Sequence, residues 1–398
     1  MNAVFTILVA VFAVIQLVRV VLPILLLFFR VTRKRKRVTA SFQPKAAVIL
    51  PCKGIEPGLE ENIRALMRQT YSEYSLILVT ESDNDPAYPL LKNLISQCPQ
   101  PVQLIVAGLT ETCSQKVYNQ CAAVDAIGKD IEIIVFVDSD AHTQPEWLAE
   151  ICAPLADTKI GATTGYRWHI PVPGNFWSIL LSSWNAQALT LLGENSPFAW
   201  GGAMAMRVED FERMQIRQHW RTALSDDLTL SNAVRRSGLR IAFVPELLAA
   251  TPAYTDMKQT LEFTTRQMLI TRIYMPVVWW QTMLGFFLYS AIFWSGLVVV
   301  IVDILRGIPI TILPLLLMLI VAQSACNAWV GLTIAIHCLP EYRVTLVKTR
   351  WAFVFMEPIM ALLYLYNIVA SSLHRRIVWR GIIYEMISAQ ETKIVRPS

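Results

Sequence analysis

Two aspartates separated by one serine follow an apolar run in the stretch IIVFVDSDAH, which begins at Ile133. Close carboxylates repel each other unless a positive charge lies between them. At the end of a strand, Asp138 and Asp140 would therefore suit a hard cation such as Mg²⁺ or Mn²⁺ that also takes phosphate oxygens. The pair alone is weak evidence for a metal site, because the same Asp-x-Asp pattern occurs by chance in turns.

A second acidic pair opens the stretch LSDDLTLSNAVRRSG, which begins at Leu224 and has the pattern of a helix. Asp226 could do no more than cap that helix. The adjacent Asp227 is more than capping requires, and a positioned carboxylate can act as a general base towards an acceptor hydroxyl. A third acidic cluster, Glu81, Asp83 and Asp85, follows an apolar run.

The region from about residue 41 to residue 275 contains the elements that would position these side chains. Short apolar runs such as AAVILP (46–51) and LILV (76–79) alternate with amphipathic helical patterns such as EPGLEENIRALMRQT. Buried apolar strands that alternate with helices indicate a mostly parallel sheet covered on both faces. Ligands of such sheets bind beyond the carboxyl ends of the strands, where two of the acidic clusters are expected.

Composition places the rest of the chain in a membrane. The 398 residues are 54% hydrophobic and 16% charged, whereas a soluble chain is roughly 25% charged. Four apolar blocks cover residues 3–29, 277–304, 308–338 and 351–373. We expect a multi-pass membrane protein, located in a bacterial inner membrane.

The basic stretch RVTRKRKR follows the first apolar block, and no acidic residue precedes Glu56. A cleaved signal peptide has its basic residues before the apolar run, so we predict a retained anchor and a cytosolic domain after it. The cluster suits an anionic lipid surface better than nucleic acid; a plain topology signal explains it equally well. Seven cysteines without a CxxC pair argue against a disulfide framework or a structural zinc site.

Glu357 and Pro358 interrupt the last apolar block, where an ionisable residue is costly. We expect this block to be broken or re-entrant, which would return the basic tail to the cytosol. The predicted domains are an N-terminal anchor with its basic segment (1–40), a cytosolic catalytic domain (41–252), an interfacial segment (253–276), membrane segments (277–373) and a cytosolic tail (374–398).

Taken together, these motifs resemble those of inverting glycosyltransferases with the nucleotide-sugar GT-A fold, and specifically the ceramide glucosyltransferase group. The similarity covers nearly the whole chain and is carried by PCKGIEPGLEENIRAL, ESDNDPAYPLLKNL, SQKVYNQ, FVDSDAHTQPEWL, GGAMAMRVEDF and SDDLTLSNAVRRSG. The resemblance implies a GT-A-type, Rossmann-like cytosolic domain of the α/β class with transmembrane helices at both ends.

The resemblance also implies roles for residues that bind the donor. Glu81 and Asp85 would contact the uridine, with Asp83 as a substitute, and Lys116 matches a donor-site lysine. Asp138 and Asp140 would hold the divalent ion and the diphosphate.

Four further positions take their roles from the same resemblance. Asp227 would be the base. Gly201 and Gly202 would let the backbone approach the sugar or the acceptor, as glycine allows. Trp379 and Arg380 match a Trp-Arg-containing tail of the group.

One motif departs from the group, which shows Gln or Arg, two residues and then Arg-Trp after the base. Here TTRQMLITRIYMP contains Arg266, Gln267 and Arg272 but no Arg-Trp pair. Arg266 or Arg272 could still bind the leaving diphosphate in a bidentate manner. Snorkelling of both arginines at the membrane surface explains them equally well.

The expected reaction moves a hexose from a UDP-sugar to the hydroxyl of a membrane lipid, with inversion of the anomeric carbon. Glucose, donated by UDP-glucose, is the first choice of sugar, and the lipid would be ceramide or diacylglycerol. The partners would be the UDP-sugar donor and a membrane lipid acceptor, with no nucleic acid. The alternatives are a polyprenyl-phosphate glycosyltransferase, a processive polysaccharide synthase and a non-enzymatic membrane protein.

Overall fold

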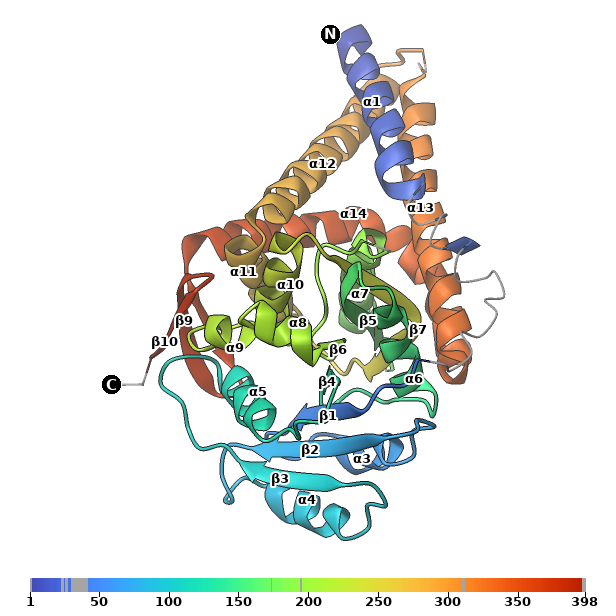
Figure 1. The fold of residues 1–398 in the computed structure, drawn as a ribbon. Helices are drawn as coiled ribbons and strands as arrows, with labels where there is room; N and C mark the ends of the chain where they lie inside the picture. Colours follow the sequence, from blue (N-terminus) through green and yellow to red (C-terminus); the bar gives the residue numbers. More distant parts are fainter. Residues whose placement is uncertain are drawn as a thin grey trace. The chain divides into compact units, whose positions relative to one another are not determined.

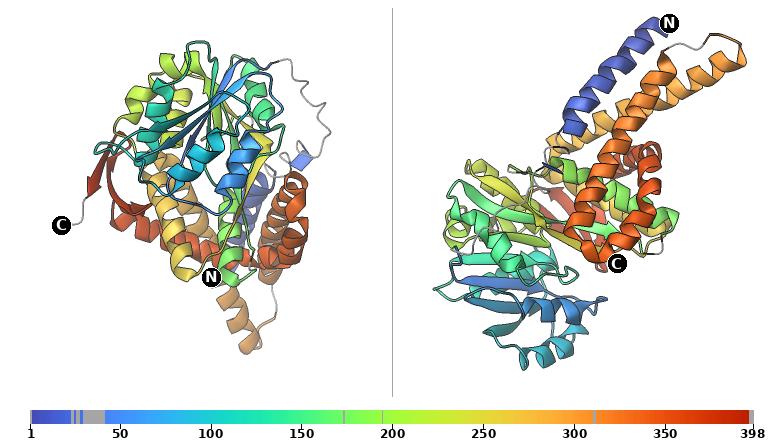
Figure 2. Two further views of the ribbon diagram at one scale, coloured as in Figure 1. Left: turned by 90° about the horizontal axis from the view of Figure 1, so that it is seen from below. Right: turned by 90° about the vertical axis from the view of Figure 1, so that its right-hand side faces the viewer.

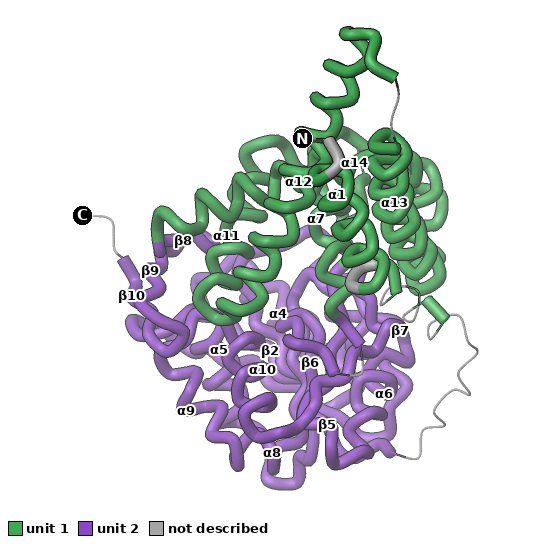
Figure 3. The backbone as a smooth tube through the Cα atoms, turned by 90° about the horizontal axis from the view of Figure 1, so that it is seen from above, with its two compact units in different colours: residues 1–34, 168–191, 252–374 green, residues 35–167, 192–251, 375–398 purple. Residues whose placement is uncertain are grey.

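The computed structural model describes residues 2–22, 25, 28–29, 42–172, 174–193, 195–309 and 312–395. The chain forms two compact units (Figure 3): unit 1 comprises residues 1–34, 168–191 and 252–374, and unit 2 comprises residues 35–167, 192–251 and 375–398. Both units are discontinuous in sequence, whereas the predicted domains are contiguous, and the predicted domain boundaries stay a prediction. The basic cluster at 30–37 lies outside the described residues, so its contact with an anionic lipid surface also stays a prediction.

A seven-stranded sheet is the centre of unit 2, and its strands lie in the order β3-β2-β1-β4-β6-β5-β7. Strands β1 to β4 pair in parallel, whereas β6 is antiparallel to both β4 and β5. The predicted α/β class with a mostly parallel sheet is confirmed. The strands are β1 (Ala46–Pro51), β2 (Tyr74–Thr80), β3 (Val102–Val106), β4 (Ile133–Val137), β5 (Ile160–Ile170), β6 (Ala203–Arg207) and β7 (Arg240–Pro252).

Helices cover both faces of this sheet, as Figures 1 and 2 show. One face packs against α3 (Leu59–Leu66), α4 (Ala87–Ile95) and α6 (Trp147–Cys152). The other packs against α5 (Gln115–Asp125), α8 (Val208–Arg213), α9 (Ile216–Trp220) and α10 (Asp226–Arg236).

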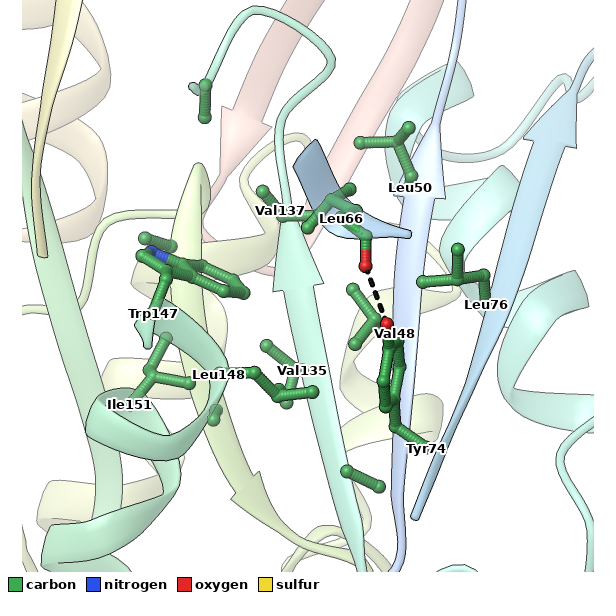
Figure 4. Close-up of a cluster of buried hydrophobic side chains, with 14 of the residues drawn as sticks. Val48, Leu50, Leu66, Tyr74, Leu76, Val135, Val137, Trp147, Leu148 and Ile151 are labelled. Carbon is green, nitrogen blue, oxygen red and sulfur yellow. Dashed lines mark hydrogen bonds between the residues drawn. The ribbon is translucent and has the colours of Figure 1, made fainter. Parts of the chain in front are cut away.

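Because successive strand residues point to opposite faces, Val48 joins the first core and Ile49 the second. Figure 4 shows part of the first core, where the Tyr74 hydroxyl donates to the carbonyl of Leu66 at 3.0 Å. Burial on both faces is the physical reason that these strands are continuous apolar runs.

Strand register brings the predicted site residues to one edge. Val137, the last residue of β4, pairs with Ala203, the first residue of the antiparallel β6. The glycine turn that precedes β6 therefore lies beside the aspartates that follow β4. The backbone N–H of Asp138 donates to the carbonyl of Gly202 at 3.2 Å.

A three-stranded antiparallel sheet completes unit 2, in the order β10-β9-β8. It consists of β8 (Arg376–Trp379), β9 (Ile382–Ser388) and β10 (Glu391–Val395). Arg380 and Gly381 connect β8 to β9 with φ values of 52° and 78°. Positive φ at both central residues is the geometry of a type I′ turn, which usually has Asn or Gly at its first central position.

Unit 1 is helical. Its helices are α1 (Asn2–Gln16), α7 (Phe176–Ala186), α11 (Met257–Tyr274), α12 (Pro276–Leu305), α13 (Leu313–Cys338) and α14 (Arg343–Leu373). Three short helical segments adjoin them: η1 (Leu17–Val21) follows α1, η3 (Gln187–Leu191) follows α7, and η4 (Pro340–Tyr342) precedes α14. In unit 2 the short helix η2 (Ala153–Ala156) follows α6. By length and composition, the described residues include three helices that could cross a membrane: Pro276–Leu305, Leu313–Cys338 and Phe355–Leu373. Within the first apolar block, Val4–Gln16 is a shorter apolar helix, so the N-terminal anchor stays a prediction.

The expected break at Glu357 and Pro358 is not found, because α14 continues as one helix through Pro358. A proline removes one intrahelical hydrogen bond, but packing against neighbouring helices holds such a segment together. Here α7, α11, α12 and α13 all pack against α14. Figure 1 shows α14 running crosswise to α13. Whether α14 crosses the membrane or re-enters it stays a prediction.

Candidate active site

Asp138 and Asp140 occupy the loop that follows β4, and two positively charged side chains, Lys116 and Arg167, lie against them. Lys116, in the first turn of α5, places its Nζ 2.7 Å from Oδ1 of Asp138. Arg167, on β5, places Nη2 3.3 Å from Oδ2 of Asp138 and 3.0 Å from Oδ1 of Asp140. The positive charge that the acidic pair requires is thus supplied by two side chains of the same unit.

The titration of this cluster follows from its charges. Burial alone would raise the pKa of Asp138, but Lys116 and Arg167 together lower it below the ordinary value. Burial alone would lower the pKa of Lys116, and the carboxylates of Asp138, Asp226 and Asp227 raise it instead. Near neutral pH Asp138 is therefore an anion and Lys116 a cation.

The donor set at β4 suits a divalent ion that takes its remaining ligands from the substrate. Within the described residues no group of three His, Cys, Asp or Glu side chains forms a self-sufficient metal site. Mg²⁺ commonly binds through one or two carboxylates together with substrate phosphates and water. Asp138 and Asp140 meet that requirement, and Arg167 neutralises them in this structure.

The glycine turn before β6 connects the two acidic sites. The backbone N–H of Gly201 donates to Oδ2 of Asp227 at 2.9 Å, and the Lys116 ammonium donates to the carbonyl of Gly201 at 3.3 Å. A Cβ at Gly201 would lie 2.8 Å from Oδ2 of Asp226 and 2.9 Å from Nζ of Lys116. Only glycine fits there without displacing charged groups.

Asp226 and Asp227 have different environments at the start of α10. Asp226 is buried, and its Oδ2 accepts from Gln120 Nε2 at 2.9 Å and lies 3.0 Å from the Lys116 ammonium. Asp227 is half-buried and accepts from Ser225 and from the N–H groups of Gly201 and Leu228. The N-cap of α10 is Ser225, so neither aspartate is present merely to cap the helix.

Asp227 has the titration expected of a base. Burial and the neighbouring Asp226 raise the pKa of Asp227 to about 6, although Lys116, Ser225 and the Gly201 amide oppose the shift. A carboxyl group whose pKa lies near the working pH can accept a proton and release it again.

The acidic cluster after β2 is divided by its contacts. Glu81 pairs with Lys53 at 2.8 Å, and the buried Asp85 accepts from the N–H groups of Gly54 and Ala87 at 2.9 and 2.8 Å. Asp83 is exposed. Asp85 thus fixes the loop after β1 to the start of α4, and Glu81 remains at the strand end.

Glu56, which the sequence did not indicate as a site residue, connects three segments of unit 2. Its carboxylate accepts from the Ser139 hydroxyl, between the two aspartates, and from Arg380 at the tip of the β8–β9 turn. Arg380 also acts electrostatically on Asp138 and Asp140. Because its two partners, Ser139 and Arg380, lie in distant parts of the sequence, no local pattern indicates this role for Glu56.

Other contacts fix the C-terminal sheet to the same unit. The Tyr384 hydroxyl accepts from the backbone N–H of Gln115 at 3.2 Å, next to Lys116. Trp379 packs edge-on against Tyr384, with ring centroids 6.5 Å apart. Trp379 and Arg380 therefore belong to a structured element beside the acidic loops.

Arg167 was also missed in the sequence analysis. The sequence feature that indicates it is a single arginine within the buried run ATTGYRWHI of β5, where a charge needs a partner.

The residues predicted to hold the diphosphate, Arg266, Gln267 and Arg272, lie on α11 of unit 1. There Arg266 stacks on Phe263 at 5.4 Å, and Arg272 donates to the carbonyl of His374 at 2.8 Å. The role of these three residues in holding a diphosphate stays a prediction.

Comparison with known proteins gives partial matches to curated relatives that include two ceramide glucosyltransferases. The chain is 43% identical over 58 residues to that of Gibberella zeae and 31% identical over 105 residues to that of Komagataella phaffii. These matches cover 14% and 25% of this chain and only 11% and 21% of the relatives.

Among solved structures, a mannosyltransferase from Pyrobaculum calidifontis, in complex with GDP-mannose and Mn²⁺, matches 93% of this chain and 98% of its own, at 15% identity and a TM-score of 0.48. The family model described as glycosyl transferase family 21 matches residues 5–392. Since that match spans almost the entire chain, the protein belongs to glycosyl transferase family 21.

Proposed function

We propose that this protein is a membrane-bound glycosyltransferase that moves a hexose from a UDP-sugar to the hydroxyl of a lipid, with inversion at the anomeric carbon. Glucose is the proposed sugar, and ceramide or diacylglycerol the proposed acceptor. Family membership and two curated relatives named ceramide glucosyltransferase support this choice.

The observation that carries the proposal is the placement of Asp227. Its half-buried carboxylate lies at the edge of the cationic cluster and has a pKa of about 6. A base in that position can take the proton of an acceptor hydroxyl as the oxygen attacks the anomeric carbon. A single displacement breaks the bond from that carbon to the diphosphate on the opposite side, which inverts the centre.

The cations beside Asp138 provide for the leaving group. Lys116 and Arg167 are fixed by carboxylates, so they are oriented before charge builds on the departing diphosphate. Preorganised charges of this kind stabilise a transition state without reorganisation during the reaction. Asp138 and Asp140 would hold Mg²⁺ or Mn²⁺, which as a Lewis acid would offset the same negative charge.

The apolar helices account for an insoluble acceptor. Three helices of unit 1 are long and apolar enough to cross a bilayer, and a lipid substrate enters an enzyme from the bilayer. A multi-pass membrane location with the catalytic unit in the cytosol, in a bacterial inner membrane, is part of the proposal.

The experiment uses detergent-purified protein with radiolabelled UDP-glucose or UDP-galactose and with ceramide or diacylglycerol as separate acceptors. The reactions run with and without EDTA, beside the Asp227→Asn variant. Labelled lipid that disappears with EDTA and with the variant would support the donor, the ion and the base, and would identify the acceptor.

Two other results would change the proposal. Metal-dependent binding of UDP-sugar without labelled lipid would favour a polyprenyl-phosphate acceptor, which needs no general base. An active Asp227→Asn variant would also favour a polyprenyl-phosphate acceptor. Absence of any nucleotide-sugar binding would overturn the enzyme assignment.

A further inference from the structure

Unit 1 contains a carboxyl group inside an apolar helix. Glu357 lies near the start of the candidate span Phe355–Leu373 and is half-buried. It accepts a hydrogen bond from Gln187 Nε2 of η3 at 3.1 Å, and it acts electrostatically on the hydroxyl of Tyr289 from α12. An ionisable group in such a helix is costly and usually marks a functional site.

Several buried polar side chains gather around Glu357. Tyr289 also approaches the hydroxyl of Ser324 on α13. Asn327 follows Ser324 by three residues and Ser183 precedes Gln187 by four, so each pair shares a helix face. The hydroxyls of Tyr289 and Ser324 interact with each other, whereas, within the described residues, the buried side-chain oxygens of Ser183 and Asn327 lack a hydrogen-bond partner. We name Glu357, Gln187, Ser183, Tyr289, Ser324 and Asn327 the polar cluster.

The polar cluster is more than a set of bonds between helices. Polar side chains that join apolar helices do so by hydrogen-bonding one another, and buried polar groups in proteins are normally paired. Here Glu357 pairs with Gln187 and Tyr289 with Ser324, but the side-chain oxygens of Ser183 and Asn327, residues at 6% exposure, are left without a partner among the described residues. A ligand with several hydrogen-bonding groups would satisfy them.

An aromatic wall adjoins the polar cluster. Tyr364 follows Glu357 by seven residues, which places both on the same face of α14. Its ring stacks on Trp184 at 5.1 Å and on Phe286 at 4.0 Å between centroids. A polar group of donors and acceptors beside a flat apolar surface matches a molecule with a polar head and an apolar body.

We propose that the polar cluster binds the head group of an uncharged lipid that carries hydroxyl or amide groups. The contacts described for Glu357 and Gln187 include no lysine or arginine, and a carboxylate would repel a phosphate. The proposal rests on the proposed function, because such a lipid would be the acceptor, and it adds a site on unit 1 that recognises it.

The test measures lipid binding without transfer. Purified protein in detergent is incubated with a short-chain radiolabelled ceramide, and retained lipid is counted after gel filtration. The variants are Glu357→Leu, Asn327→Leu and the isosteric Glu357→Gln. Thr349→Val is the matched control, because Thr349 is also a buried polar residue of α14, but its hydroxyl donates to the carbonyl of Thr345 in the same helix at 3.0 Å. UDP binding by each variant reports separately on the donor site.

The proposal predicts at least a tenfold loss of retained ceramide in both leucine variants, a smaller loss in Glu357→Gln, and near-normal retention in Thr349→Val, with UDP binding unchanged. Equal retention by all variants, with only a lower melting temperature, would show that the cluster merely joins the helices and would overturn the proposal. Displacement of ceramide by polyprenyl phosphate at lower concentration than by unlabelled ceramide would overturn the choice of an uncharged head group. Retention of lipid by a protein that transfers no sugar would refute the proposed function and leave this site intact.

Discussion

Lys116 Nζ lies 2.7 Å from Oδ1 of Asp138, which joins the first turn of α5 to the carboxyl end of β4. The same ammonium lies 3.0 Å from Oδ2 of Asp226. One side chain therefore connects the acidic loop proposed for the donor with the acidic pair proposed for the acceptor.

Replacing Lys116 by methionine should weaken binding of the nucleotide sugar. Charge-assisted hydrogen bonds contribute about 1.5–3 kcal/mol, so we expect the donor KM to rise roughly 10- to 100-fold. Lys45→Met is the matched control, because Lys45 also pairs with an aspartate, but at the surface, where the two side chains are 36% and 62% exposed, and surface pairs contribute about 0–1 kcal/mol. Equal donor KM values for the two variants would contradict the assignment of Lys116.

Asp227→Asn should lower kcat and leave donor binding nearly unchanged, because the amide keeps the size of the side chain but accepts no proton. Loss of a general base typically costs about 10²- to 10⁴-fold in rate. The comparison is Asp226→Asn, which removes a partner of Lys116 and should raise the donor KM instead. Rates and donor affinities of both variants separate the two roles, and a normal kcat for Asp227→Asn would exclude it as the base.

The rate should depend on pH through Asp227. Burial and Asp226 raise its pKa to about 6, and only the ionised form can accept a proton. The rate should therefore fall as the pH drops through about 6, approaching a tenfold loss per pH unit below it. Residual activity of Asp227→Asn should lack this limb of the profile. A rate that is constant between pH 5 and pH 7 would disagree with the assignment.

Gly201→Ala should impair both folding and activity. The added Cβ would meet Asp226 Oδ2 and Lys116 Nζ at 2.8 and 2.9 Å, and overpacking typically costs about 1–3 kcal/mol. Gly193→Ala is the control, since a Cβ there meets nothing within 4 Å. Thermal unfolding and transfer assays should show a loss for the first variant alone, and equal stability of both would refute the predicted clash.

Glu56→Gln should loosen the C-terminal sheet. The change removes the charge that pairs with Arg380, so amide hydrogen exchange in residues 376–395 should become several-fold faster. Glu385→Gln provides the control, because Glu385 pairs with Arg376 inside the same sheet. If both variants exchange at the wild-type rate, Glu56 does not hold this element in place.

The sequence predicted those parts of the fold that local pattern determines. The apolar runs of β1, β2 and β4 and the carboxylates after them follow from burial on two faces and from the location of ligands at strand ends. The contacts of Glu56 and Arg167 were not predicted, because each depends on strands that are paired only after folding. Pro358 was taken for a break because its cost is local, whereas the packing that holds α14 together is tertiary.

The C-terminal sheet has a consequence for the order in which this protein is made. Glu56 and Arg380 are 324 residues apart, and every apolar helix from α12 to α14 lies between them in the chain. A ribosome would therefore translate all three helices before it supplied the strand that completes the unit containing Asp138 and Asp227. The polypeptide would complete unit 2 only after these helices had been synthesised, so the ion pair between Glu56 and Arg380 could not form while they were still being translated.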